Sequence, residues 1–250
     1  MAVYALSDLH GNLELLRAIQ KFLNEDDTVY FLGDGGDRGP RPWETIKEIY
    51  KDKRFIYMKG NHEDMLVKAV VDYIDYECLD YSFQTLASNG GEKTFFDFID
   101  QPLDTQHSWL HILKNLPLMM TYKNTSGMEI ILSHAGFTPD PYKKPKEKDL
   151  LWDRAHIYEF VPDEFENTII VHGHTPIQYM FHNFNDINRL VGKPEIPFEY
   201  GAFYYSGTQK ICIDQGTYSS GRALLLDLDT FDEHIFETKT APVSDYNDWL

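Results

Sequence analysis

An aspartate and a histidine follow the first apolar run of the chain and are two positions apart. Residues 2–7 read AVYALS, and Asp8 and His10 come directly after them. Side chains two positions apart on a strand share a face, so this pair could bind one metal ion together. A helix cap beside a surface histidine gives the same D-x-H pattern, and taken alone the pattern favours that interpretation.

A glycine-rich loop with three ionic groups follows the second apolar run. Residues 33–39 read G-D-G-G-D-R-G. A tight turn with an internal ion pair would explain the glycines, but it would not explain two acids and an arginine in one loop. The pattern favours a functional loop in which Asp34 bridges two metal ions, Asp37 orients a neighbouring residue and Arg38 binds phosphate through its forked guanidinium.

The third apolar run ends in G-N-H-E at residues 60–63. Asn61 offers a carbonyl oxygen to a hard divalent ion and could also contact the substrate. His62 is placed to protonate a leaving oxygen, with Asp37 holding its ring as carboxylates commonly do. The same residues could simply cap a helix.

Three further histidines and a second arginine follow later strands. Residues 133–136 read S-H-A-G and residues 172–176 read H-G-H-T-P, which places His134, His172 and His174 after strands. The segment L-W-D-R at 151–154 adds Arg154 beside an aromatic ring. In isolation this segment favours a structural arginine stacked on that ring, as cation–π pairs are.

Together these groups indicate a two-metal site. Carboxylate and amide oxygens with imidazole nitrogens suit Mn, Fe, Zn or Co rather than Ca. Two such ions about 3.5–4 Å apart clamp a transferring phosphoryl group and generate hydroxide near neutral pH. Water would then be the nucleophile, which agrees with motifs that hold no exposed candidate serine or cysteine.

The elements that must position these residues alternate between strand and helix. Strand–loop–helix units recur about every 26 residues in the first third of the chain, which is typical of βαβ architecture. Ligands in open α/β sheets bind beyond the carboxyl ends of the strands, where such loops converge. We expect strands at 2–7, 28–32, 54–58, 128–133, 168–172, 209–213 and 222–228, and helices at 12–23, 41–51 and 63–75.

Two stretches interrupt this rhythm within a single domain that we expect to cover residues 1–250. Residues 76–117 predict a helical insertion, with a turn at 89–91 and helices near 92–99 and 105–115. Residues 177–208 are aromatic, contain two prolines and predict an irregular insertion. Both should flank the site. Residues 239–250 are expected to form a loosely packed tail.

Composition limits the partners of the chain. The net charge of −17 over 250 residues disfavours an extended nucleic-acid footprint, which requires clustered Lys and Arg. No run approaches the roughly 18 apolar residues of a membrane span, and the N-terminus resembles a strand rather than a signal peptide. The two cysteines, Cys78 and Cys212, have no metal or disulfide spacing. We therefore expect a cytoplasmic protein with no membrane partner.

The order of the motifs resembles the calcineurin-like metallophosphoesterases. D-x-H, G-D-x-x-D-R-G, G-N-H-E, a later histidine and G-H-T-P follow one another between residues 8 and 176. The L-W-D-R segment and the region of Asp214, Gly216 and Gly221 further resemble the prokaryotic branch related to the bacteriophage lambda Ser/Thr protein phosphatase. This resemblance implies an α/β fold, a four-layer α/β/β/α sandwich of two mixed sheets.

The resemblance also implies a role for each site residue. Asp8 and His10 would bind the first metal ion and Asp34 would bridge. The second ion would be bound by Asn61, His134 and His174. His62 would be the general acid supported by Asp37, while Arg38 and Arg154, with Asn61, would hold the substrate. The expected cofactors are two divalent ions, Mn first, with Fe, Zn, Co or Ni as alternatives.

The chain departs from the family pattern at three positions. Gly35 and Gly36 occupy places that are usually bulky or β-branched, so the loop is expected to be more mobile. Pro176 stands where related families have the second histidine of G-H-x-H, which leaves the first metal ion one protein ligand fewer. His172 matches no ligand position and is treated as a neighbour of the site.

These features predict a metal-dependent phosphatase. The leading hypothesis is a phosphomonoesterase of the Ser/Thr protein phosphatase type, acting on a phosphoprotein, a nucleotide or a small phosphoester. The alternative is a dinucleoside polyphosphate hydrolase or another phosphodiesterase, and aromatic residues of the two insertions could then stack a nucleobase. A scaffold without turnover is least favoured because every ligand and the acid are present.

Overall fold

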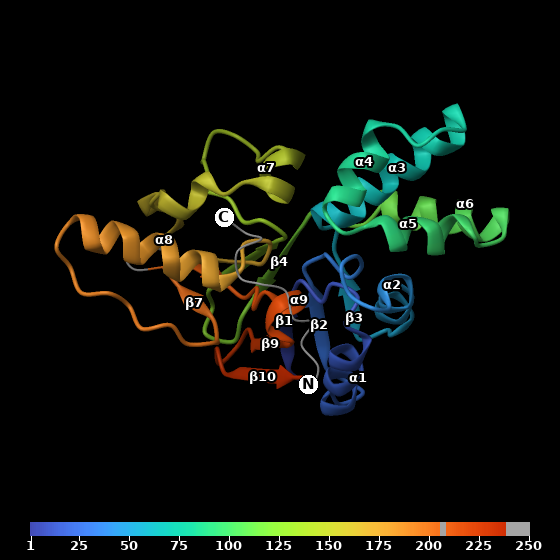
Figure 1. Cartoon of the computed structure of the whole chain (residues 1–250). Helices are drawn as coiled ribbons and strands as arrows, with labels where there is room; N and C mark the ends of the chain where they lie inside the picture. Colours follow the sequence, from blue (N-terminus) through green and yellow to red (C-terminus); the bar gives the residue numbers. More distant parts are fainter. Residues whose placement is uncertain (206–208, 239–250) are drawn as a thin grey trace.

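Two five-stranded sheets pack face to face in the computed structural model, which describes residues 1–205 and 209–238 (Figure 1). The first sheet has the spatial order β10 (Glu233–Glu237), β9 (Arg222–Asp227), β1 (Val3–Leu6), β2 (Thr28–Phe31) and β3 (Phe55–Tyr57). Strands β1, β2 and β3 are parallel, whereas β9 and β10 are antiparallel additions. The carboxyl ends of the three parallel strands therefore meet at one edge.

The second sheet repeats this arrangement with a parallel centre. Its order is β4 (Met119–Lys123), β5 (Glu129–Ser133), β6 (Thr168–His172), β8 (Lys210–Cys212) and β7 (Phe203–Tyr204). Strands β5, β6 and β8 are parallel, and β4 and β7 are antiparallel edges. Both sheets are thus mixed, as expected.

The period-two pattern of the strands separates two apolar layers. Val3 and Ala5 of β1 face the second sheet and pack in the same core as Val171 of β6. Tyr4 and Leu6 point the other way, into the core beneath the helices. Successive strand residues face opposite sides, so one short strand serves both layers.

Helices cover the outer face of each sheet. The first sheet is covered by α1 (Leu13–Phe22), α2 (Pro42–Lys51) and α3 (Asn61–Tyr76). On the second sheet lie α7 (Glu147–Trp152), α8 (Ile177–Leu190) and the short turns η1 (Ala155–Tyr158) and η2 (Asp163–Phe165). Figure 1 shows the two helical groups on opposite sides of the paired sheets. The four-layer α/β/β/α sandwich is confirmed.

The helical insertion contains three helices, α4 (Tyr81–Ser88), α5 (Glu92–Ile99) and α6 (Leu103–Lys114). Two of them correspond to the helices expected near 92–99 and 105–115, and α4 was not anticipated. The buried Phe98 of α5 packs edge-on against Trp43 of α2, with ring centroids 5.1 Å apart. The insertion is therefore anchored to the first helical layer.

The stretch expected to be an irregular insertion, residues 177–208, begins with a regular helix. Residues 177–190 form α8, and Ile177 and Met180 are buried against the second sheet while Phe181 and Phe184 are partly buried. Apolar residues at 177, 180, 181 and 184 follow helical spacing, which the later prolines and aromatic residues obscured. The tail expected at 239–250 lies outside the described residues. Among the residues described, no helix is long and apolar enough to span a bilayer.

Candidate metal centre

The six residues expected to bind metal converge at the carboxyl ends of the parallel strands. Strands β1 and β2 of the first sheet end just before three of these residues, and a fourth is the first residue of α3. Strands β5 and β6 of the second sheet end just before the other two. All six side chains are buried, with at most 7% of their surface exposed. They are Asp8, His10, Asp34, Asn61, His134 and His174.

The backbone of this region is unusual because many non-glycine residues adopt the left-handed conformation. Six of the eight described non-glycine residues with positive φ belong to the candidate site. Such conformations are costly and tend to occur at functional sites, where the surroundings enforce them. The six are Asp8, His10, Asp34, Asp37, Arg38 and His174.

Gly35 and Gly36, which depart from the family pattern, are enclosed by neighbouring side chains. A β-carbon at Gly35 would lie 2.6 Å from the Tyr57 hydroxyl, and one at Gly36 would lie 2.7 Å from Cδ1 of Ile46. The amide of Gly35 donates to the Glu63 carboxylate at 3.0 Å. Close packing therefore explains the glycines, and the loop is held by its neighbours instead of being loosened by the two small residues.

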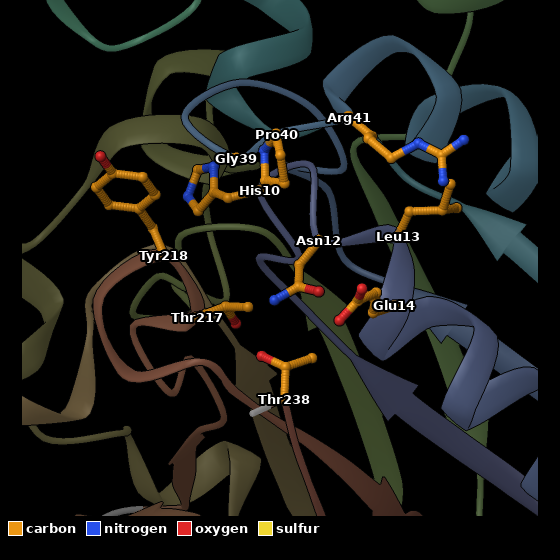
Figure 2. Close-up of a pocket in the computed structure, with 10 residues that line it drawn as sticks. All are labelled: His10, Asn12, Leu13, Glu14, Gly39, Pro40, Arg41, Thr217, Tyr218 and Thr238. Carbon is orange, nitrogen blue, oxygen red and sulfur yellow. The ribbon is translucent and has the colours of Figure 1, made fainter. Parts of the chain in front are cut away.

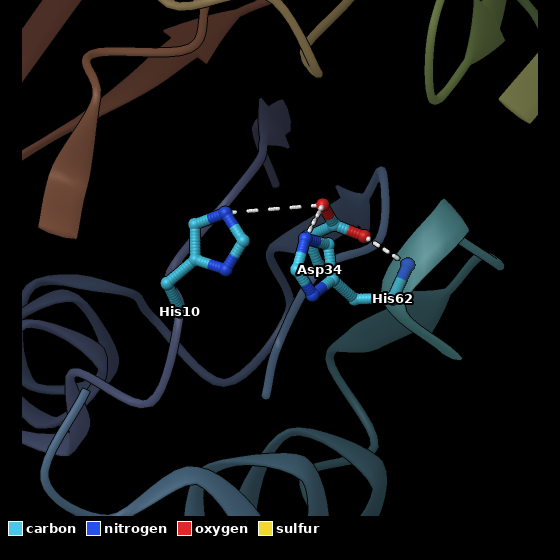
Figure 3. Close-up of side chains that lie close together, drawn as sticks. All are labelled: His10, Asp34 and His62. Carbon is cyan, nitrogen blue, oxygen red and sulfur yellow. Dashed lines mark hydrogen bonds and ion pairs between the residues drawn. The ribbon is translucent and has the colours of Figure 1, made fainter. Parts of the chain in front are cut away.

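Asp34 is the carboxylate shared by two groups of potential ligands. One group combines it with Asp8 and His134, whose Nε2 lies 3.4 Å from Oδ2 of Asp34. The other combines it with His10 and His62, each with a ring nitrogen 3.8 Å from the same oxygen (Figure 3). The ligand atoms of each group lie within 4.8 Å of one another. A shared central carboxylate fits a bridging position.

Asn61 and two histidines place potential metal-binding atoms close together. Oδ1 of Asn61 lies 2.7 Å from Nε2 of His134 and 3.0 Å from Nδ1 of His174. Nδ1 of His134 lies 2.9 Å from the Leu32 carbonyl and donates to it, which leaves a lone pair on Nε2 facing the Asn61 oxygen. Nε2 of His174 is buried with no partner among the described residues. These donors fit a divalent ion of the Mn, Fe or Zn type.

Burial controls the charge of these groups. It lowers the pKa of His10, His134 and His174, so their rings are neutral and can ligate a metal. Burial also raises the pKa of Asp8 and of Asp34, and the charges of Asp8 and Glu63 raise the pKa of Asp34 further. Buried carboxylates so close together are stabilised by a cation.

A second set of contacts links His62 to the loop after β2. Nδ1 of His62 lies 2.5 Å from the Asp37 carboxylate, and the hydroxyl of Thr94 also donates to Asp37. Arg38 extends its guanidinium to Nε2 of His10 and to Nε2 of His62, at 3.1 Å each. Burial raises the pKa of Asp37 to about 7. Asp37 lies beside the His62 ring, where the sequence placed it, and Arg38 contacts the other ring nitrogen, which the sequence did not predict.

Arg154 and Trp152 approach the site from the second sheet. Arg154 is exposed, and its charge is one of those that, after burial, lower the pKa of His174. The ring of Trp152 lies edge-on to His174, with centroids 6.1 Å apart. The L-W-D-R segment thus borders the candidate centre.

Two positioning residues escaped the sequence-based interpretation. The Glu63 carboxylate accepts from the amides of Asp34 and Gly60, at 2.8 Å each, and from the Tyr57 hydroxyl at 2.7 Å. Its place two residues beyond Asn61 at the start of a helix is the signal of a capping box. Thr94 lies in the helical insertion, and no local pattern connects it to Asp37.

His172 lies beside the centre without joining either ligand group. Its Nδ1 is 2.9 Å from the Gly173 carbonyl and its Nε2 is 2.8 Å from the Tyr205 hydroxyl. Both ring nitrogens are therefore engaged away from the carboxylates, which agrees with its expected position as a neighbour.

Comparison with known proteins decides the family. A model of the calcineurin-like phosphoesterase family matches residues 1–210. The chain belongs to this family. Together with the two ligand groups, this membership identifies a metal-dependent phosphoester hydrolase.

Relatives of this phosphoesterase carry two kinds of name. It is 24% identical to the asymmetrical bis(5′-nucleosyl)-tetraphosphatase of Oceanobacillus iheyensis, over 71% of this chain and 78% of that protein. It is 28% identical to serine/threonine-protein phosphatase 2 of Salmonella typhimurium, over 62% of this chain and 69% of that protein. The chain spans about half the length, 46%, of a symmetrical tetraphosphatase of Buchnera aphidicola that it also matches.

The phosphoesterase fold also matches solved structures. A putative diadenosine tetraphosphatase superposes with a TM-score of 0.56 at 17% identity, over 95% of this chain and 94% of that one. At this identity the likeness supports the fold and carries no information on substrate.

Proposed function

We propose that the protein is a dinuclear metal-dependent phosphomonoesterase that uses water as the nucleophile. The observation that carries this proposal is the sharing of Asp34 between two groups of buried ligands. When bound, two divalent ions would lower the pKa of a water molecule and neutralise phosphate oxygens. Asp8 and His10 are proposed for one ion, Asn61, His134 and His174 for the other, with Asp34 between them.

His62 is proposed as the general acid. Its Nε2 accepts from Arg38 and its Nδ1 donates to Asp37, so the ring is neutral in this arrangement. A bound phosphate would draw the guanidinium of Arg38 toward itself and release Nε2. The ring could then carry a proton to the leaving oxygen while Asp37 stabilises its charge. Arg154 would hold a further phosphate oxygen.

One candidate substrate is a phosphorylated protein. A Ser/Thr phosphatase among the relatives supports this assignment. Arg38 and Arg154 supply the cationic donors that a phosphomonoester dianion needs. Mn is proposed as the first metal to test, with Fe, Zn, Co and Ni as alternatives, and a cytoplasmic location is proposed with it.

The second candidate is a dinucleoside polyphosphate. Tetraphosphatases among the relatives support it. A cavity beside His10 supports it as well, because it would accept a part of the substrate next to the reacting phosphate.

A substrate panel tests the proposed function. The purified protein, stripped of metal and reloaded with Mn, would be given p-nitrophenyl phosphate, phosphopeptides, nucleotides and diadenosine tetraphosphate. Metal-dependent hydrolysis of p-nitrophenyl phosphate is expected, with the stripped protein as the control. Equal rates with and without metal would contradict the proposed chemistry, and the rates on the other substrates rank the two substrate classes.

A further inference from the structure

A cavity of about 110 Å³ opens beside His10 (Figure 2). His10 contributes both to this cavity and to the ligand group around Asp34. The start of α1, the loop before α2 and the short helix α9 (Thr217–Ser220) enclose the rest. A molecule in the cavity would therefore lie next to the metal centre, with His10 between them.

Polar side chains converge inside the cavity. Figure 2 shows Asn12, Glu14, Thr217 and Thr238 directed toward one another. The Thr217 side chain is only 1% exposed, and its hydroxyl has no hydrogen-bond partner in the described part of the chain. A buried hydroxyl without a partner is costly, so a ligand group that pairs with it would be favoured.

The other groups leave donors and acceptors available. Oδ1 of Asn12 accepts from the Leu15 amide at 3.1 Å, which leaves the amide hydrogens of Asn12 free to donate. The Thr238 hydroxyl donates to the Gly221 carbonyl at 3.3 Å and can still accept. Glu14 is in no ion pair within residues 1–205 and 209–238.

The charge in the cavity selects the class of ligand. The Glu14 carboxylate repels an anion such as a second phosphate. Arg41 also lines the cavity, but its guanidinium is paired with Glu44 and is directed away from Asn12 and Thr217 (Figure 2), so it does not offset this charge. A neutral group with adjacent hydroxyls fits best: two hydroxyls donate to the carboxylate and accept from an amide or a hydroxyl. Acidic residues bind the ribose of nucleotides in this way.

We propose that this cavity binds the ribose diol of a nucleotide whose phosphate lies at the metal centre, with Glu14 as the residue that selects ribose. The proposal rests on the proposed function and deepens it, since it assigns nucleoside phosphates or polyphosphates as the substrate class. The other interpretation is structural: Asn12 caps α1 and Glu14 favours the helix N-terminus electrostatically.

Matched nucleotides and matched variants separate the two interpretations. The value of kcat/KM would be measured for adenosine phosphates and their 2′,3′-dideoxy analogues, with Mn-loaded wild-type protein. Loss of hydroxyls that donate to a carboxylate should cost about 10- to 100-fold. In Glu14→Gln the ratio of kcat/KM for the ribose substrate to kcat/KM for its dideoxy analogue should fall to a few-fold. Glu44→Gln is the control, because Glu44 is also an acid in the first turn of a helix but does not line the cavity.

Thr217→Val supplies a second variant in case Glu14→Gln is poorly folded, and Tm is measured for each protein. Equal wild-type rates on the ribose and dideoxy substrates would overturn the inference, as would an unchanged ratio in folded Glu14→Gln. Hydrolysis of p-nitrophenyl phosphate without any hydrolysis of nucleotides would overturn it too, yet leave the proposed function intact. No metal-dependent hydrolysis of any phosphoester would instead remove the proposed function itself.

Discussion

Two buried groups of histidines occupy neighbouring parts of the molecule, and only one of them lies beside the carboxylates of a candidate metal site. In the metal centre, the rings of His134 and His174 pack edge-on with centroids 5.0 Å apart. In a second group, which we call the lysine cluster (His156, His172, Tyr205 and Lys210), the two imidazole rings pack in the same way at 4.8 Å. Burial lowers the pKa of the histidines in both groups.

The difference lies in the charge beside the rings. Asp8 and Asp34 adjoin the first pair, whereas the buried ammonium of Lys210 adjoins the second. Lys210 donates to the carbonyls of His156 and Glu159 at 2.5 and 2.9 Å and to the Thr138 hydroxyl at 2.8 Å. After burial, its charge is the next cause of the lowered His156 pKa, which is about 3. Buried histidines alone therefore do not make a cation site; the adjoining carboxylates do.

Removal of the shared carboxylate should have the largest effect. Asp34→Asn takes a negative charge from both ligand groups, so kcat on p-nitrophenyl phosphate should fall by at least about 1000-fold, equivalent to several kcal/mol of transition-state stabilisation. Metal content, measured by atomic emission, should fall with it. Retained activity would exclude Asp34 as the bridge.

Metal should stabilise the folded protein through the metal centre and not through the lysine cluster. Because the buried carboxylates are relieved by a cation, Mn at about 100 times its Kd should add roughly 2.7 kcal/mol to the free energy of unfolding of the wild type. Asp34→Asn should lose most of this gain, as urea titrations with and without chelator would show. A metal-induced gain that persists in Asp34→Asn would place the ion elsewhere.

One histidine from each region provides the next test. His62→Asn should lower kcat by about 10²- to 10⁴-fold while metal content stays near normal, since His62 is proposed to act as the acid. His172→Asn should change kcat by only a few-fold, and its cost should appear as a lower Tm. Loss of metal in His62→Asn would instead make His62 a ligand, as its presence in one ligand group allows.

Titration of Lys210 should give the smallest effect. Burial lowers its pKa from 10.5 to about 8 in the folded protein. Between these two values the unfolded chain binds more protons, so the contribution of Lys210 to stability should rise as pH increases from about 8 to 10.5. Lys210→Met should therefore cost more stability at pH 10 than at pH 7, beyond the roughly 1–3 kcal/mol of its lost hydrogen bonds. A cost that is independent of pH would contradict the lowered pKa.

The sequence was sufficient for the features that depend on short-range order. Asp8, Asp34 and Asn61 each lie within a few residues of an apolar run in the sequence. That run predicts a strand, so the sequence alone places each residue just beyond a strand end. Parallel strands then bring those ends together. The expected sandwich followed from the resemblance, because periodicity alone does not specify how two sheets pack.

Other features depend on contacts between distant segments. Thr94 reaches Asp37 across 57 positions, and Lys210 reaches the carbonyl of His156 across 54. No local pattern encodes either contact. The aromatic residues of α8 had helical spacing, but the prolines that follow them suggested irregular structure. The cavity beside His10 was also beyond the sequence, because the segments that enclose it come from both ends of the chain.

The contact between Thr94 and Asp37 has a consequence for engineering. The helical insertion resembles a module that could be exchanged to alter substrate choice, yet it also provides the hydroxyl that positions the partner of His62. The Gly90 carbonyl of the same insertion accepts from the amide of Arg38 at 2.8 Å. A graft that keeps residues 89–94 should preserve turnover, whereas a replacement of the whole insertion would change the recognition surface and misplace the acid at once.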